Sequence, residues 1–189
     1  MNIVRPTILA SLLLLAGCSS PNPNLYSIAM VPGTPQRGGP DLVTLHEISI
    51  ARYLQRSQIV QSTSDYRLNV QSNDWWDEPP SAMLNRVLVE ELSQRLPGTE
   101  VLAELGAVSA DASAVVQLNI LRMEAGPDKV LNLEAQIAVG DKRDGRPFLR
   151  KVANLTVPIA GSDTRSTVAA ISLAVGQLAD IIASMLHSV

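Results

Sequence analysis

Three stretches in the second half of the chain alternate between apolar and polar residues. The clearest is 130–139, where every second side chain is aliphatic; 114–123 and 149–159 repeat the pattern less strictly. A period of two places the apolar side chains on one face of a strand. The short turn 126–128 and the polar, charged loop 140–147 join the three stretches, so they are predicted to form an antiparallel meander.

Two other segments carry helical spacing. Residues 84–96 repeat leucine and valine every three or four positions, with Asp77 as a candidate cap, Pro79 or Pro80 in the first turn and Pro97-Gly98 as the stop. A longer helix begins after Ser162 or Asp163 and runs to the C-terminus. The first helix is predicted to bury one stripe against the sheet.

The last helix is unusually apolar, since Asp180 is its only formal charge after Ser166. A narrow polar stripe nevertheless recurs every three or four residues, which a membrane-spanning helix would not keep. We therefore expect an amphipathic helix with a very wide apolar face. Packing on the sheet alone is one outcome; in the other, Leu173 or Ile181 stays near solvent and a second subunit covers it. The polar stripe consists of Ser172, Gly176, Asp180, Ser184 and His187.

The first part of the chain predicts shorter elements. Strands are expected over 25–30, 42–50, 59–60 and 100–105, with a Pro- and Gly-rich loop over 31–40 and a polar turn over 51–58. Tyr66, Leu68 and Val70 alternate with polar residues, which predicts a half-buried strand. No repeat or long linker interrupts the pattern, so residues 25–189 are expected to form one α/β domain.

The N-terminus predicts the compartment. Residues 1–17 have a positive start and an apolar run too short to span a bilayer, as in a signal peptide. The run ends in Leu15-Ala16-Gly17-Cys18, which closely resembles the lipobox of bacterial lipoproteins. That resemblance implies three acyl chains on Cys18, enough for stable anchoring. Residues 18–24 would be the lipidated Cys and its tether, and Ser19 in place of Asp favours the outer membrane.

Composition excludes several function classes. The chain of 189 residues has a formal net charge of −3, which does not suggest nucleic-acid binding, and one Cys, which precludes an internal disulfide. Neither His46 nor His187 lies in a catalytic or metal-binding motif, and no phosphate loop or nucleophile elbow is present. Glu90 and Glu91 are expected on the solvated face of the first helix. The sequence therefore predicts a non-enzymatic protein with no metal, no cofactor and no nucleic-acid partner.

The pair Trp75-Trp76 stands out in a chain with only six aromatic residues. Adjacent residues before a helix cannot both point inward. One Trp is expected in the core, and the other is expected to be partly exposed, where it could contact a partner.

Two motifs carry a resemblance to a known family. Arg52-Tyr53-Leu54-Gln55-Arg56-Ser57-Gln58-Ile59-Val60 and Trp76-Asp77-Glu78-Pro79, together with the lipobox and Asn24-Leu25-Tyr26-Ser27-Ile28, make the chain resemble the PqiC/YmbA-type ABC transport auxiliary lipoproteins. Gln55 and Pro80 depart from the family's motifs, which have Asp and Leu there.

The resemblance implies a three-layer α/β domain with a mixed sheet and two main helices. It also implies an outer-membrane lipoprotein that faces the periplasm, partners an MCE-domain protein in lipid transport and forms homo-oligomers. The alternative is a lipoprotein for envelope assembly or maintenance outside any transport conduit. The partner or oligomer interface is expected at Tyr53, Leu54, Trp75, Trp76, Leu173 and Ile181.

Overall fold

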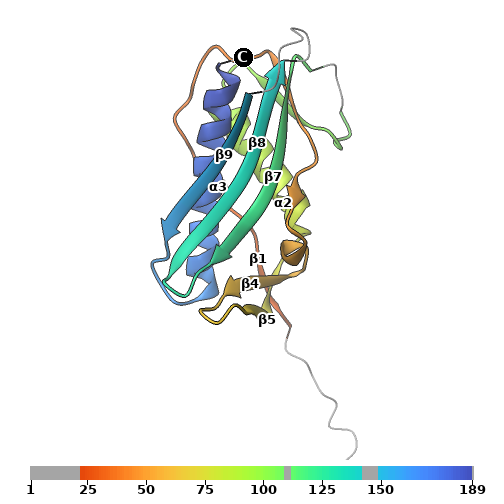
Figure 1. The fold of residues 1–189 in the computed structure, drawn as a ribbon. Coiled ribbons are helices and arrows are strands. Elements are labelled where there is room, and N and C mark those ends of the chain that lie inside the picture. The colour runs from red at the N-terminus through yellow and green to blue at the C-terminus, as the bar shows by residue number, and fades with distance from the viewer. Residues whose placement is uncertain (1–21, 109–111, 142–148, 189) are drawn as a thin grey trace, which may run out of the picture.

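The computed structural model describes residues 22–108, 112–141 and 149–188. Residues 1–17, which the sequence predicts to be a signal peptide, and Cys18, the predicted lipidation site, lie outside these residues. Nine strands in one mixed sheet, two α-helices and a short 3-10 helix make up the described part (Figure 1). The strands are β1 (Asn24–Tyr26), β2 (Leu42–Leu45), β3 (Ser49–Ile50), β4 (Gln58–Ser62), β5 (Leu68–Trp76), β6 (Glu100–Ala103), β7 (Ala114–Ala125), β8 (Val130–Asp141) and β9 (Leu149–Pro158); the helices are η2 (Arg52–Leu54), α2 (Pro80–Arg95) and α3 (Thr164–Leu186).

The predicted antiparallel meander is confirmed. Strand β7 pairs antiparallel with β8, and β8 pairs antiparallel with β9. On its other side β7 pairs parallel with β2, β3 and β4, and the sheet continues from β4 to β5 and β1 and from β2 to β6. The mixed α/β class with two main helices, including a long C-terminal one, is therefore as predicted.

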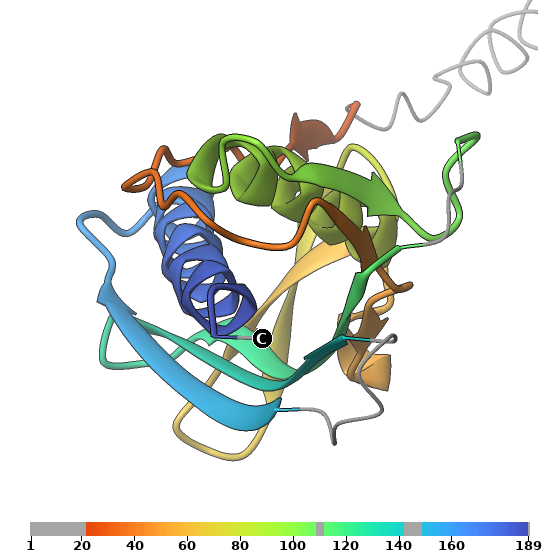
Figure 2. The same cartoon turned by 90° about the horizontal axis from the view of Figure 1, so that it is seen from above.

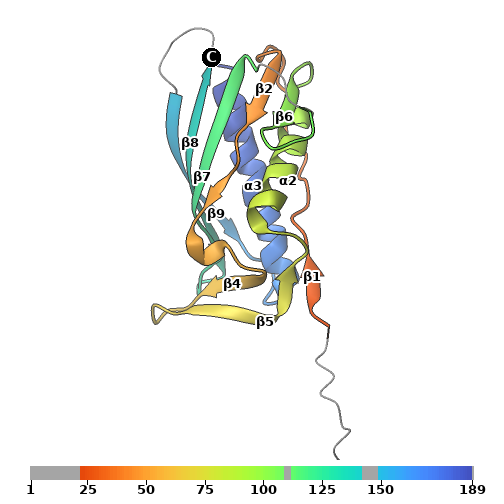
Figure 3. The ribbon, with the colours of Figure 1, turned by 90° about the vertical axis from the view of Figure 1, so that its right-hand side faces the viewer.

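Both helices lie on one side of the curved sheet, as the view from above shows (Figure 2). The alternating aliphatic residues of β8 all point to this side and are buried against α3, whose own inward residues are buried as well. A segment that we call the N-terminal strap, residues 27–36, runs along the helix pair on the side away from the sheet (Figure 3). The layers are thus sheet, helices and strap.

Helix ends follow the sequence with one exception. Pro80 is the first residue of α2, Gly98 adopts a φ of +101° just after the helix, and the Asp163 side chain accepts from the N–H of Ser166 at 2.9 Å to cap α3. Asp77 does not cap α2, because Pro79 occupies the capping position and no side chain bonds there.

Two predicted strands differ in the structure. The stretch 42–50 is broken into β2 and β3, and only 24–26 of the first stretch is a strand. The strand predicted from the Tyr66–Val70 pattern is confirmed from Leu68 onward as part of β5. The prediction that it is half-buried is wrong, since the apolar side chains at this end are exposed: Leu68 at 41% and Val70 at 37%. No described element covers that face.

Helix α3 has the length and hydropathy of a membrane span, but 67% of its most apolar window is buried inside the fold. Part of its polar stripe is buried too, because it faces the strap: the N–H of Ala29 donates to Ser172 Oγ at 3.1 Å, and Val31 packs on Gly176. An added Cβ at Gly176 would lie 3.0 Å from Val31 Cβ, so the strap needs a glycine at this contact.

Candidate functional site

The two motifs meet in space. The N–H of Trp76 donates to the carbonyl of Ser57 at 2.7 Å, and Trp75 lies opposite Gln58 in the β4–β5 ladder. Strand pairing thus places the segment that enters α2 directly beside the turn that contains η2. Between them lies a cleft of about 490 Å³, which we call the motif cleft. It is lined by Glu47, Ile50, Gln55, Arg56, Ser57, Trp76, Asp77, Glu78, Pro79, Pro80 and Ser81.

The motif cleft has an apolar floor and a charged rim. Trp76 and Ile50 are buried, whereas Arg56 and Asp77 are exposed. Glu78 is held by Arg86, whose Nη2 lies 2.6 Å from Glu78 Oε1, and this bond is the main cause of the raised pKa of Arg86. An apolar floor with a polar rim is the usual anatomy of a protein-binding site.

The structure separates the two tryptophans as expected. Trp76 is 8% exposed and belongs to the core, while Trp75 is half-buried and its Nε1–H donates to the carbonyl of Ser72 at 3.0 Å. Leu54 corrects the sequence prediction: it is only 4% exposed, because η2 turns its side chain into the core. Leu54 therefore supports the cleft from inside and offers no surface to a partner.

Tyr53 lies beside Leu54 and is half-buried. Burial, and next the nearby Glu124 carboxylate, raise the pKa of the Tyr53 hydroxyl far above its usual value, so the phenol stays neutral. Glu124 is 6% exposed and accepts from Arg122 Nε at 3.1 Å, while its Oε2 has no hydrogen-bond partner among the described residues. A role for Tyr53 in an interface stays a prediction.

The wide apolar face of α3 is only partly covered. Leu173 is 46% exposed, and Met30 of the strap, at 41%, comes from the segment that packs beside it. Ile181 is half-buried and packs against the core. Of the two α3 residues expected near solvent, Leu173 is therefore the more accessible.

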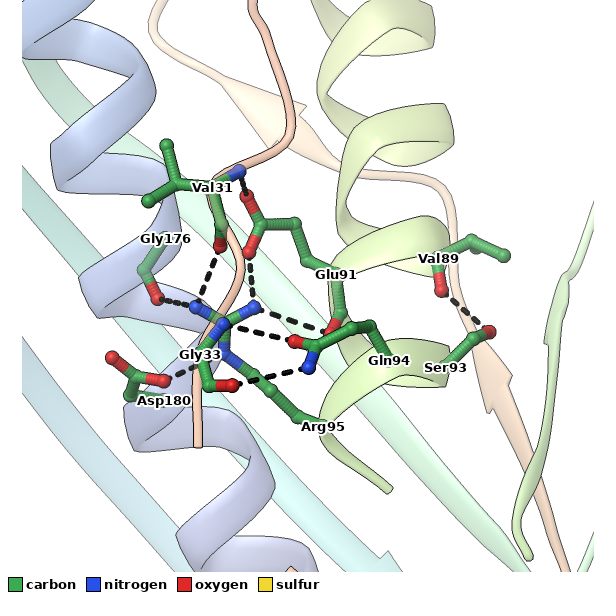
Figure 4. Close-up of polar contacts among 9 residues, drawn as sticks. All are labelled: Val31, Gly33, Val89, Glu91, Ser93, Gln94, Arg95, Gly176 and Asp180. Atoms are coloured by element: carbon green, nitrogen blue, oxygen red, sulfur yellow. Dashed lines mark hydrogen bonds and ion pairs between the residues drawn. The ribbon is translucent and has the colours of Figure 1, made fainter. Parts of the chain in front are cut away.

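A buried ionic cluster fastens the strap to both helices (Figure 4). Arg95, 1% exposed, extends from the end of α2 and forms an ion pair with Glu91, one turn earlier. Its Nε lies 2.6 Å from Asp180 Oδ1 on α3, and its Nη2 donates to the carbonyls of Val31 and Gly176, each at 3.0 Å. One guanidinium thus joins α2, α3 and the strap.

Backbone groups of the strap complete this cluster. The N–H of Val31 donates to Glu91 Oε1 at 2.7 Å, and Gln94 makes two hydrogen bonds with the backbone of Gly33. An added Cβ at Gly33 would lie 2.4 Å from the Arg95 guanidinium, so only glycine fits there without a shift. The expectation that Glu91 is a solvated surface residue is wrong, since its side chain is fully buried.

The Glu91 carboxyl gives stability a pH dependence. Burial raises its pKa above the ordinary 4.5, against the opposing effects of Val31 N–H and Arg95 and with a small contribution from Asp180. Between the ordinary and the raised pKa, the folded chain keeps the Glu91 carboxyl protonated while the unfolded chain has released that proton. The stabilisation that comes from this proton is therefore complete below pH 4.5 and is lost as pH rises through the raised pKa.

Urea unfolding across this pH range should show the free energy of unfolding of the wild type falling relative to that of Glu91→Gln. Glu90→Gln is the control. Parallel pH profiles for the wild type and Glu91→Gln would contradict Glu91 as the source of the pH dependence.

The described residues hold no group of three His, Cys, Asp or Glu side chains that could bind a metal ion. His46 Nε2 lies 3.8 Å from Glu104 Oε1, and His187 is exposed near the end of α3. The Trp pair and the motifs therefore remain the features that point to function.

Comparison with known proteins is consistent with this geometry. The family model described as the ABC-type transport auxiliary lipoprotein component matches residues 26–183, which include both motifs, the strap, α2 and most of α3. The chain belongs to this family of transport auxiliary lipoproteins.

Individual relatives agree with the family assignment. The chain is 33% identical over 95 residues to the intermembrane transport lipoprotein PqiC of Escherichia coli K12, and equally to that of Shigella flexneri. The match covers 48% of this chain, and the chain spans about half the length, 51%, of these relatives. The crystal structure of XCC0632 from Xanthomonas campestris shares the fold at a TM-score of 0.70 and 16% identity, over 87% of this chain and 96% of that one. Another crystal structure, of an uncharacterized protein, matches at a TM-score of 0.72 and 16% identity, with 87% and 98% covered.

Proposed function

We propose that this family member is a non-catalytic lipoprotein, acylated at Cys18, that faces the periplasm from the outer membrane. In this proposal it docks an MCE-domain protein that bridges the envelope and carries lipid. The observation that carries the proposal is the motif cleft, because both motifs of the family resemblance line it. The name of the PqiC relatives, intermembrane transport lipoproteins, supports the transport role.

The docking surface is the motif cleft with the exposed edge of Trp75. In this proposal, the buried Trp76 at the floor of the cleft contacts an apolar side chain of the partner. The exposed charges of Arg56 and Asp77 at the rim set the orientation in which the partner binds. The cleft lies where η2, β4 and the start of α2 converge, and the Trp76–Ser57 hydrogen bond joins the two segments that form its walls.

Site-specific photocrosslinking in cells tests this docking. A photoreactive residue in place of Arg56 should capture an MCE-domain protein, whereas one in place of Asn154, exposed on β9, should not. Capture of an envelope-assembly machine at residue 56 would instead favour the alternative function. Equal capture from both positions would contradict the motif cleft as the docking site.

Self-association is the second part of the proposal, and Leu173 tests it. Leu173 on α3 and Met30 on the strap are both exposed apolar residues, and the strap is bonded to α3 at Ser172, next to Leu173. A second copy would cover this apolar surface. In the mature chain without acyl groups, Leu173→Glu should convert an oligomer to a folded monomer at high micromolar concentration, as measured by light scattering. Gln177→Glu, exposed one turn further along, is the matched control. A monomeric wild type under these conditions would remove homo-oligomerisation from the proposal.

A further inference from the structure

The tip of the β4–β5 hairpin presents three apolar side chains to solvent. Tyr66 is fully exposed, and Leu68 and Val70 follow it on β5 at 41% and 37% exposure. Leu68 and Val70 lie at alternate positions of β5 and share one face of the strand, whereas Tyr66 precedes β5 and lies in the hairpin turn. The three side chains together leave apolar surface at the tip that the described residues do not cover.

Strand register shows which way this face points. Leu68 pairs with Ser62, and Val70 with Val60, so these side chains share one face of the hairpin. Gln61 and Gln71 lie on the other face, where Gln71 Nε2 donates to Gln61 Oε1 at 3.1 Å and Gln61 Nε2 contacts Thr167 Oγ1 on α3. The face that carries Leu68 and Val70 is therefore the one opposite the Gln61–Thr167 contact with α3. Val60 on that face is buried in the core, so the exposed apolar surface is confined to the part of the hairpin between Val70 and the tip.

The backbone at the tip is also unusual. Tyr66 adopts a φ of +64°, the left-handed region that Gly, Asn and Asp tolerate better than an aromatic residue. Its ring is fully exposed, so packing within the domain does not repay this strain. Strain held at an exposed aromatic residue points to a role outside the folded core.

Chain connectivity places the hairpin near the membrane. Strand β1 pairs with β5, and Asn24 lies opposite Asp74, with its Nδ2 donating to Asp74 Oδ1 at 2.8 Å. Six residue-to-residue steps lead from Cys18 to Asn24, a reach of at most about 22 Å. Strand β1 and the hairpin lie at the same end of the molecule, opposite the C-terminal end of α3 (Figures 1 and 3).

We propose that Tyr66, Leu68 and Val70 insert into the interfacial region of the bilayer that holds the acyl chains of Cys18. This inference rests on the proposed acylation. A Tyr ring, apolar with a polar tip, suits the headgroup boundary, and the two aliphatic side chains add apolar area. Arg67 at the tip forms an ion pair with Asp65, so the tip carries no net charge and the contact should persist at high salt. The hairpin would hold the domain in one orientation on the membrane.

A single fluorophore tests the insertion in the full-length acylated protein. Because the mature chain has only Cys18, Tyr66→Cys or Val70→Cys supplies the one free thiol for an environment-sensitive label. In vesicles of phosphatidylethanolamine and phosphatidylglycerol, emission from either site should shift to the blue and be quenched severalfold by lipids brominated in the upper acyl chain. Ser188→Cys, at the opposite end of the roughly 35 Å α3, should show neither effect. A blue shift without lipid quenching would indicate contact with another protein copy and overturn the proposal.

A second variant separates insertion from folding. Tyr66→Asn with Leu68→Thr keeps residues suited to the turn and the strand, so the domain should fold as before while the label at Val70→Cys loses most of its lipid quenching. Unchanged quenching would contradict the proposal. Mass spectrometry of Cys18 distinguishes failure of the lipoprotein proposal from failure of the hairpin contact. An unacylated Cys18 overturns the lipoprotein proposal, whereas an acylated chain with unquenched labels overturns only the hairpin contact.

Discussion

Arg95→Met is expected to lower the free energy of unfolding by about 3–5 kcal/mol, the usual cost of removing one partner from a buried ion pair. The substitution leaves the Glu91 carboxylate fully buried and without its cation, and it frees the carbonyls of Val31 and Gly176. Methionine fills part of the same volume, so the loss reflects the charge and the hydrogen bonds more than a cavity. Urea unfolding of the mature chain measures it.

Two controls identify the cause. Arg86→Met removes a partly exposed guanidinium that pairs with Glu78, just before α2, and with Glu90, one turn further along α2, and it should cost less than about 1 kcal/mol. The double variant Glu91→Leu with Arg95→Met removes both charges and should recover much of the stability, because no unpaired ion stays buried. Equal losses from Arg95→Met and Arg86→Met would show that the cluster contributes little.

The position of this cluster connects stability with the proposed anchoring. The strap follows β1, which is the first described strand after the tether, and Arg95 holds it against α2 and α3. Under our proposal, a force transmitted from the acyl chains acts first on the pairing of β1 with β5 and then on the ion pairs and hydrogen bonds of this cluster. Loosening the strap would also disturb the position of Met30, which lies on it.

Periodicity predicted the elements because burial imposes it locally. The meander was visible since β8 buries one face against α3 along its whole length, and α2 was visible through its leucine stripe and the prolines at both ends. The break between β2 and β3 was missed, although its residues His46 and Glu47 are polar, because aliphatic residues resume at Ile48 and both strands pair with β7.

The site was less predictable, since its contacts join residues far apart in sequence. Arg95 contacts Asp180 and Val31 only once the two helices have packed together. The polar stripe of α3 has the pattern of a solvated edge, but part of it is the surface on which the strap packs. Two signals were available: Glu91 and Arg95 are spaced one turn apart, and Asp180 is the sole acidic residue in α3. The alternation of apolar and polar residues in β5 likewise predicted an apolar face, but it could not indicate whether another element covers that face.

Cys18→Ala is expected to abolish lipid attachment completely. Acylation needs the Cys18 sulfur, and the chain has no other Cys to replace it. Under our proposal, three acyl chains, at about 0.8 kcal/mol for each buried CH₂, would make release of the wild type into water very unfavourable. The variant should lose all palmitate labelling and accumulate as an uncleaved or mis-sorted precursor, with its domain folded.

Ser19→Asp is the matched control for this experiment, because it leaves the sulfur in place. It should keep full palmitate labelling and, by the sorting preference that favours Ser19 for the outer membrane, move the protein toward the inner membrane. Membrane fractionation with palmitate labelling of all three proteins distinguishes the outcomes. Labelling that persists in Cys18→Ala would contradict the lipoprotein proposal, and with it the membrane contact of the β4–β5 hairpin, because the tether would no longer place that end of the domain at a bilayer.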